Sequence, residues 1–245
     1  MLTFFRKIRK ALLDSGSTGK YLLYAIGEIA LVVIGILIAL QINNWNEWRK
    51  DRIEEKEILR EIIVEIHTNV QGMERDLRFN KRCSRSYEVM MNVIRVKPEW
   101  NDSLEIHVCT PLLATVPTIS FAAYESLRAK GVDLIANKSL QKDIVALYEM
   151  NYRKLVTRVK RVLVENIKPL VPPFVTKRFV RSLGTWGAYF PNDFKKLVND
   201  QEYMNLLTYV EGYRIGQSNG HLSRSLNESQ RVLQLVVDEL GENDE

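Results

Sequence analysis

The residue with the most unusual setting for its chemistry is Glu28, a carboxylic acid inside an apolar run. Residues 21–40 read YLLYAIGEIALVVIGILIAL and carry no other charged side chain. Burying a carboxylate in hydrocarbon is costly, so such a group is a functional hypothesis by default. Glu28 could carry protons in a channel or an energy-transducing complex. Alternatively, it is protonated or hydrogen-bonded at a helix interface, or it only sets the position of the helix.

Two small residues share the helical face of Glu28. Gly35 and Ala39 form a small-xxx-small pair, which lets two membrane helices approach closely. Glu28, Gly35 and Ala39 therefore form the predicted intramembrane polar and packing site. Its partner would be a second copy of this chain or another membrane protein.

Cysteine and histidine supply the other candidate reactive groups. Cys83 and Cys109 make an even count and could form one disulfide in an oxidising compartment, whereas in the cytoplasm they would be free thiols. His67, His107 and His221 are scattered, and His107 with Cys109 would need distant acids to hold a metal. The sequence contains no HExxH, P-loop, GxSxG or CxxC motif. We therefore expect no enzymatic activity, no cofactor and no metal.

A basic run on one expected helix is the remaining candidate for binding. It consists of Arg153, Lys154, Arg158, Lys160 and Arg161. Such runs usually form a solvated helix face, and a site for an anionic lipid or partner is the alternative.

The elements that must position these groups begin with a membrane span over residues 21–41. Twenty residues at about 1.5 Å each give roughly 30 Å, the thickness of the hydrocarbon core of a bilayer. The apolar stretch is longer than the core of a signal peptide, and no A-x-A-like cleavage site follows it. Tyr21 and Tyr24 at one end, and Trp45 and Trp48 beyond the other, resemble the aromatic belts of membrane proteins. We expect an uncleaved, single-pass anchor.

The charge of the first 20 residues favours one orientation of this anchor. They hold five of the 35 basic residues and one of the 30 acidic residues, which is most of the net charge of +5. This pattern predicts a basic amphipathic leader that lies against an anionic cytoplasmic leaflet. We therefore expect a cytoplasmic N-terminus, with the remainder of the chain outside. A nucleic-acid role would need basic charge over the main domain, so none is expected.

A heptad seam follows the span and predicts a long membrane-proximal helix over residues 42–97, ended by Pro98. Its positions step by four and three residues, and two of them are polar. They are Leu59, Ile63, Ile66, Val70, Met73, Leu77, Asn80, Ser84, Tyr87, Met91 and Ile94. Such a seam is either the core-facing side of one helix in a bundle or half of a coiled coil formed with a second copy.

Residues 98–245 are expected to form a helical domain that packs with this long helix. Prolines make residues 97–118 irregular, Gly131 ends a short helix over 121–130, and Asn137 or Ser139 caps a helix that runs to about Lys168. Residues 174–191 are predicted to be irregular or mixed, and helices cover 192–240. No strand pattern of useful length is present. The predicted fold is all-α: one transmembrane helix that continues into a long helix, then an antiparallel helical bundle.

Three glycines interrupt the last helical segment at four-residue intervals. Gly212, Gly216 and Gly220 indicate close helix packing or a hinge. Because glycine weakens a helix, we favour a locally bent helix here.

Two segments carry a resemblance to a known family. They are KYLLYAIGEIALVVIGILIALQINNWNE (residues 20–47) and FAAYESLRAKGVDLIANKSLQKDIVALY (residues 121–148). Together they resemble a family of uncharacterised single-span membrane proteins of Bacteroidetes-type bacteria, defined by a domain of unknown function. The resemblance implies a membrane-anchored helical protein with no established activity. It also implies a Gram-negative host, which places the anchor in the inner membrane and the helical domain in the periplasm.

Two functions fit these observations. The first is a non-enzymatic scaffold, sensor or partner-binding module held at the membrane. The second is an accessory subunit of a transport or ion-driven complex, with Glu28 as its working group.

Overall fold

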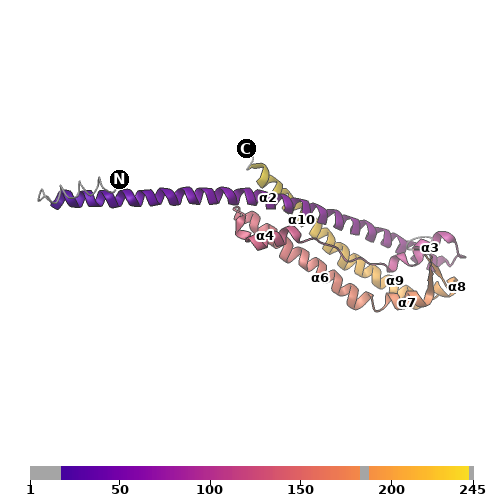
Figure 1. Cartoon of the computed structure of the whole chain (residues 1–245). Helices are drawn as coiled ribbons and strands as arrows, with labels where there is room; N and C mark the ends of the chain where they lie inside the picture. Colours follow the sequence, from indigo (N-terminus) through magenta and orange to yellow (C-terminus); the bar gives the residue numbers. More distant parts are fainter. Residues whose placement is uncertain (1–17, 183–187, 243–245) are drawn as a thin grey trace. The chain divides into compact units, whose positions relative to one another are not determined.

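The computed structural model describes residues 18–182 and 188–242 (Figure 1). These residues are mainly helical, and one two-stranded hairpin is the sheet that they contain, so the fold is all-α as predicted. The chain divides into two compact units, Met1–Glu55 and Lys56–Glu245. Most of the predicted basic leader, residues 1–17, lies outside the described residues.

The first described element is α2, an α-helix from Thr18 to Val96. In the first unit it carries the apolar run, in which large side chains such as Leu23, Leu31 and Ile36 are more than half exposed. This helix is long and apolar enough to cross a membrane. A helix suits that environment because it satisfies its backbone hydrogen bonds internally.

Helix α2 ends one residue before the predicted boundary. Lys97 adopts a positive φ of 51°, and its N–H donates to the carbonyl of Val93 at 2.7 Å. Pro98 has no N–H to extend the helix and disfavours helical backbone at the residue before it. The predicted stop at Pro98 is therefore confirmed.

In the second unit, α2 buries one stripe of side chains against other helices of the same chain. Ile62, Asn69, Cys83, Ser86 and Met90 are buried although the predicted seam omits them. The stripe is therefore wider than a coiled-coil seam and has the width of a core-facing helix in a bundle. This supports the bundle interpretation of the heptad pattern.

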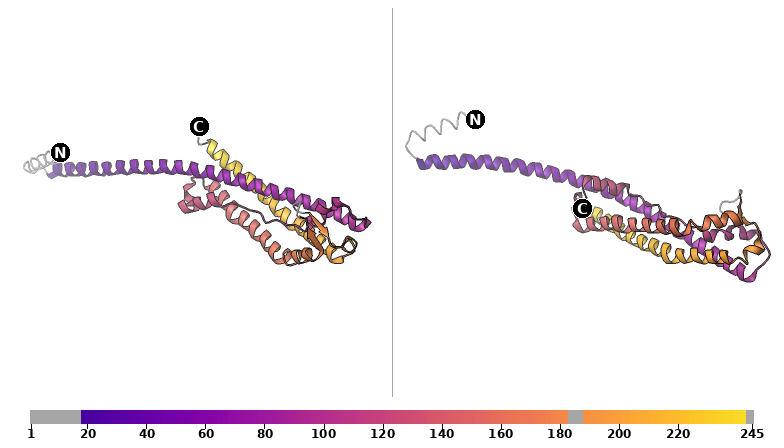
Figure 2. Two further views of the ribbon diagram at one scale, coloured as in Figure 1. Left: turned by 45° about the vertical axis from the view of Figure 1, so that its right-hand side comes forward. Right: turned by 90° about the horizontal axis from the view of Figure 1, so that it is seen from below.

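The remaining elements all belong to the second unit, in which η1 to η3 are 3-10 helices and η4 to η6 are π-helices. In chain order they are η1 (Asp102–Leu104), α3 (Glu105–Val108), η2 (Thr110–Leu112), α4 (Ala122–Lys130), η3 (Val132–Leu134), α5 (Lys138–Val145), η4 (Ala146–Tyr152), α6 (Arg153–Val162), η5 (Leu163–Ile167), α7 (Val171–Arg178), β1 (Phe179–Arg181), β2 (Tyr189–Pro191), α8 (Phe194–Leu197), α9 (Gln201–Tyr213), η6 (Arg214–Asn219) and α10 (Gly220–Glu242). Figure 2 shows α10 beside α6, with which it is in contact.

Two buried clusters form the core of this unit. The first joins α2 to α4, α5, η4, α6 and α10, and it contains Ile66, Tyr148 and Val232. The second joins the end of α2 to α3, α7 and α9, and it contains Met90 and Tyr203. Side chains from distant parts of the sequence thus meet on one face of α2.

Two predicted helix boundaries are confirmed by their caps. Gly131 follows α4 with a φ of 105°, a value that suits glycine because it lacks Cβ. The side chain of Asn137 caps α5 by accepting hydrogen bonds from the N–H groups of Ser139 and Leu140, at 3.1 and 3.2 Å.

The segment predicted to be irregular or mixed, residues 174–191, contains secondary structure that the sequence did not indicate. Helix α7 occupies its first part, and β1 pairs antiparallel with β2, so that Val180 lies opposite Phe190. Each strand has only three residues. That length is too short for alternating hydrophobicity to be recognised in the sequence.

One of the two interpretations of the three glycines, close helix packing, is wrong. A Cβ at Gly212, Gly216 or Gly220 would meet nothing within 4 Å, so these residues do not mark close helix packing. Instead, the π-helix η6 separates α9 from α10. The favoured interpretation, a locally bent helix, stays a prediction.

Candidate functional site

The predicted intramembrane residues all lie on α2 in the first unit. Glu28 is half-buried, whereas Gly35 and Ala39 are exposed. A Cβ at Gly35 would meet nothing within 4 Å, which leaves room for a second helix at that position. The role of these three residues stays a prediction.

The two cysteines are free thiols in the structure, and both are buried. Burial raises the pKa of both thiols, and for Cys83 the nearby guanidinium of Arg214 opposes that effect. Cys109 belongs to the second core cluster, with Val108 and Leu112 as neighbours in the chain. The predicted disulfide between Cys83 and Cys109 is therefore not formed in this structure.

None of the three histidines belongs to a metal-binding group of acids and thiols within the described residues. His107 Nδ1 shares a hydrogen bond of 2.9 Å with the hydroxyl of Ser86. Burial and the charge of Arg85 lower the pKa of His107. Among residues 18–182 and 188–242, no group of three or more histidine, cysteine, aspartate or glutamate side chains is placed to hold a metal ion.

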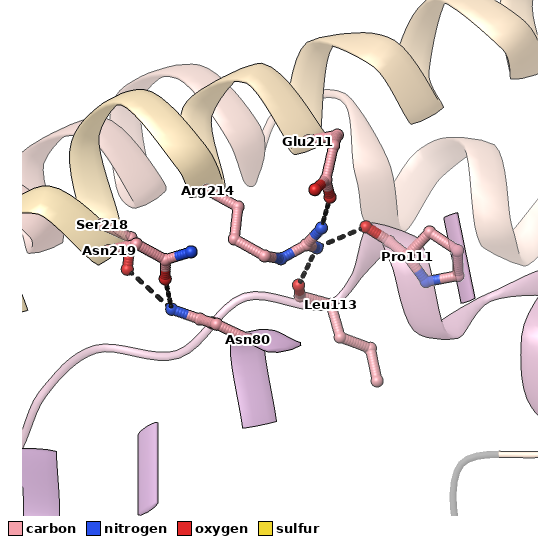
Figure 3. Close-up of polar contacts among 7 residues, drawn as sticks. All are labelled: Asn80, Pro111, Leu113, Glu211, Arg214, Ser218 and Asn219. Atoms are coloured by element: carbon pink, nitrogen blue, oxygen red, sulfur yellow. Dashed lines mark hydrogen bonds and ion pairs between the residues drawn. The ribbon is translucent and has the colours of Figure 1, made fainter. Parts of the chain in front are cut away.

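A buried polar group joins α9 and η6 to η2 and to Leu113, the residue that follows η2 (Figure 3). Arg214 forms an ion pair with Glu211, and its Nη2 donates to the carbonyls of Pro111 at 2.6 Å and Leu113 at 3.0 Å. Both charged side chains are almost fully buried. The guanidinium therefore holds η2 and the residue after it in place, which shows a structural role for this charge.

Asn80, one of the two predicted polar layers, is part of the same region (Figure 3). Its Nδ2 donates to the hydroxyl of Ser218 at 3.1 Å and to Oδ1 of Asn219 at 2.8 Å. The polar layer thus pairs α2 with η6.

Glu65 is a second buried carboxylate with a structural role. It accepts hydrogen bonds from the hydroxyl of Ser120 at 2.7 Å and from the N–H groups of Ala123 and Tyr124 at 3.0 and 3.3 Å. These N–H groups open α4, whose N-cap residue Phe121 offers no side-chain cap. A carboxylate from α2 therefore stabilises the positive end of α4.

The strongest candidate for ligand binding is a cavity of about 620 Å³ bounded by η4, α6 and α10, which we call the basic cavity. Its lining consists of Met150, Asn151, Arg153, Lys154, Leu155, Thr157, Arg158, Arg161, His221, Arg224 and Ser225. Five of these residues are cationic, and none carries a carboxylate. The volume is in the range of small-molecule sites, about 300–1,000 Å³.

Most of the positive charge in the basic cavity is not neutralised by the protein. Arg153 pairs with Glu149 at 2.7 Å, whereas Arg158 donates a hydrogen bond of 3.3 Å to the neutral side chain of Gln217. Within the part of the chain that the structure describes, Lys154, Arg161 and Arg224 have no carboxylate partner. Such a cavity attracts anions.

The pKa of His221 reflects the same concentration of positive charge. Partial burial lowers its pKa, and the charges of Arg158 and Arg224 lower it further, because each cation disfavours a second positive charge nearby. At neutral pH His221 therefore lines the cavity as a neutral side chain.

A second group of arginines lies on α2 but is less positive. Arg75, Arg78 and Arg82 line a cavity of about 670 Å³. Asp76 lines the same cavity, and Arg78 has Glu74 at 3.7 Å. The carboxylates offset part of the charge, so the basic cavity is the stronger candidate.

The predicted basic run accounts for only one side of the basic cavity. Arg153, Lys154, Arg158 and Arg161 line it, whereas Lys160 does not. His221, Arg224 and Ser225 complete it from α10, and sequence reasoning missed their role. Arg224 and Ser225 lie three and four residues after His221, so all three share one helix face. This spacing is the feature of the sequence that could have indicated their role.

Comparison with known proteins identifies a family model that matches the chain. No characterised protein and no solved structure has significant similarity to the chain. The model of the family of unknown function DUF6090 matches residues 28–211. This range includes Glu28, both cysteines and α6, and it ends before α10. The part of the resemblance that concerns a domain of unknown function is thereby confirmed, and the chain belongs to the DUF6090 family of unknown function.

Proposed function

We propose that this protein is a single-pass membrane protein whose second unit, Lys56–Glu245, is a non-enzymatic binding module that acts as a scaffold or a sensor. The observation that carries the proposal is the contrast between the two units. The apolar run on α2 exposes large hydrophobic side chains over the length of a bilayer, whereas the second unit buries two apolar clusters of its own. A bilayer accommodates the first unit, and water accommodates the surface of the second.

The proposal includes an orientation in the inner membrane. The basic residues 1–20 stay in the cytoplasm by the positive-inside rule, and the second unit lies in the periplasm. Gly35 and Ala39 leave a close approach open to a second copy or to a partner membrane protein.

Membrane extraction and topology fusions test this proposal. We expect the full chain to resist extraction at alkaline pH, as an integral membrane protein does. Alkaline phosphatase fused after Glu245 should be active, and a fluorescent protein that fails to mature after export should stay dark at the same position. Extraction into the soluble fraction would refute the anchor. Fluorescence without phosphatase activity would refute the orientation.

The alternative function, an accessory subunit of an ion-driven complex, centres on Glu28. Glu28 is half-buried on a helix where most neighbouring side chains are exposed. In that case Glu28→Gln, which keeps the shape but cannot ionise, should abolish the activity of the complex without disturbing its assembly. Glu57→Gln, on the same helix outside the apolar run, is the matched control. Unchanged activity in Glu28→Gln would favour a plain anchor.

A further inference from the structure

We infer that the basic cavity binds a compact soluble anion that carries two or more phosphate groups. This inference deepens the proposed function, since it names what the second unit binds, and it rests on the part of that proposal that assigns a binding role. The site is built entirely from the second unit, so it does not depend on the orientation in the membrane.

The charge of the cavity sets the class of ligand. Lys154, Arg158 and Arg161 from α6 face the same space as Arg224 from α10. These cations repel one another, and an anion between the two helices relieves the repulsion from both sides. A single negative charge would leave most of this field uncompensated, so a multivalent anion fits best.

The types of side chain favour phosphate. Four of the five cations are arginines, whose guanidinium groups form paired hydrogen bonds with phosphate oxygens. The Ser225 hydroxyl donates to Oδ1 of Asn151 at 2.5 Å, and this hydrogen bond fixes the amide so that its Nδ2 remains a donor. Thr157 adds a hydroxyl to the lining. The cavity thus combines fixed charge with neutral donors, which a site for phosphate oxygens needs.

The backbone around the cavity is also unusual. The π-helix η4 contributes Met150 and Asn151 to the lining, and Gln217 of the π-helix η6 contacts Arg158 at 3.3 Å. π-Helical turns are rare and occur frequently at functional sites. Two of them adjoin the cavity, from helices that are far apart in the sequence.

Pyrophosphate is a suitable probe, because it is the smallest soluble anion with two linked phosphate groups. We would titrate it into the full-length chain in neutral detergent micelles and follow binding by calorimetry. We expect saturable binding that weakens as the salt concentration rises, since screening acts on charges at a partly open site. Citrate tests whether the site prefers phosphate to carboxylate groups, and vesicles rich in phosphatidylglycerol test whether a lipid headgroup is the source of the phosphate.

Two lysines on α6 provide a matched pair of variants. Lys154 lines the cavity, whereas Lys160 is exposed on the same helix outside it. Lys154→Gln should weaken pyrophosphate binding about tenfold, and Arg158→Gln with Arg224→Gln about a hundredfold, as expected for lost charge-assisted hydrogen bonds. Lys160→Gln should leave the affinity within about twofold, because it removes the same charge at a position that does not face the ligand. Circular dichroism checks that each variant is folded.

The NMR signals of the three histidine rings can show where the anion binds. Proton NMR should show the ring signals of His221 moving on titration, while those of His67 and His107 stay in place. Equal weakening by Lys154→Gln and Lys160→Gln would overturn the inference, as would movement of His107 alone, which lines another cavity with Arg82 and Arg85. Equal affinity for citrate would overturn the assignment to phosphate, and binding to vesicles but not to pyrophosphate would assign the site to lipid. Loss of the membrane anchor in the extraction test would leave these results unaffected.

Discussion

Two arginines in the second unit form ion pairs whose contributions to stability should differ, because one pair is buried and the other is not. Arg214 and Arg231 each pair with a glutamate three residues earlier in the chain, Glu211 and Glu228. Arg214 is 2% exposed, whereas the side chain of Arg231 is 47% exposed. The first pair is removed from water, whereas the second stays partly exposed and shares its arginine with Asp143.

We expect Arg214→Met to lower the free energy of unfolding by about 3–5 kcal/mol, because it leaves the carboxylate of Glu211 buried without a counter-charge. Arg231→Met should cost less than about 1 kcal/mol, as exposed pairs do. Urea denaturation of the full chain in detergent measures both. Similar losses in the two variants would contradict the structural role of Arg214.

The thiols offer a second test at the level of single residues. Cys83 and Cys109 are buried, and burial raises the pKa of each thiol. Since the thiolate is the reactive form, the native protein should resist alkylation by a maleimide, and both cysteines should react once urea unfolds the chain. If the unfolded chain reacts only after treatment with a reductant, the cysteines form the disulfide that the sequence suggested, and the free thiols of the structure are not the form in the cell.

The sequence predicted the role of single residues where that role depends on neighbours close in the chain. The basic run over residues 153–161 was visible because helical spacing alone places its members near one another. Glu65 and Arg214 could not be assigned, because their partners Ser120 and Pro111 are distant in the sequence. A buried charge gives no local sign of which distant carbonyl or N–H group it will meet.

At the scale of elements, two glycines that look alike in the sequence have opposite roles. Gly131 ends α4 with a φ of 105°, whereas Gly220 begins α10 with helical angles, a φ of −65° and a ψ of −37°. A Cβ would meet nothing within 4 Å at either position, so backbone conformation alone separates them.

Gly131→Ala should therefore destabilise the protein by about 1–3 kcal/mol, since alanine is strained at this φ. Gly220→Ala should stabilise it by about 0.5–1 kcal/mol, because alanine favours helix. Thermal unfolding followed by circular dichroism compares the two variants directly. A change of the same sign in both would show that one of these backbone conformations is not that of the folded protein.

Helices with clear caps and stops were predicted correctly from the sequence. Pro98, Gly131 and Asn137 each act on the backbone within a few residues of their own position, so their effects do not require the tertiary structure. The hairpin of β1 and β2 was not predicted, because three-residue strands carry no recognisable alternation. The π-helices were not predicted either, since an α-helix and a π-helix use the same residue types.

At the scale of the molecule, the core of the second unit is self-contained. Both buried clusters consist of residues from Ile58 onward. We therefore expect a fragment of residues 56–245 to fold without the apolar run, with a helical circular dichroism spectrum and a single cooperative thermal transition. A fragment of residues 98–245, which lacks the core-facing part of α2, is the control and should be unfolded or aggregated. Cooperative folding of the control would show that α2 is not part of the core.

The all-α fold was predictable because length, apolar periodicity and proline positions all indicated helices. The composition of the basic cavity was not, because it depends on which face of α10 meets α6. Hydrophobic spacing defines a core-facing side for each helix, but it does not define which two helices become neighbours.

The π-helices also have a consequence for how this family changes in evolution. In η4 the N–H of Arg153 donates to the carbonyl five residues before it, that of Tyr148, and in η5 the N–H of Lys168 donates to that of Leu163 at 2.8 Å. Each such turn holds one residue more than an α-helical turn, so it can absorb a single-residue insertion without turning the following helix by about 100°. Relatives that lack one residue at these positions would have continuous α-helices there. Gaps in an alignment of the family should therefore cluster at residues 146–152 and 163–167. The cations of α6, which follow the first of these positions, would still face the cavity.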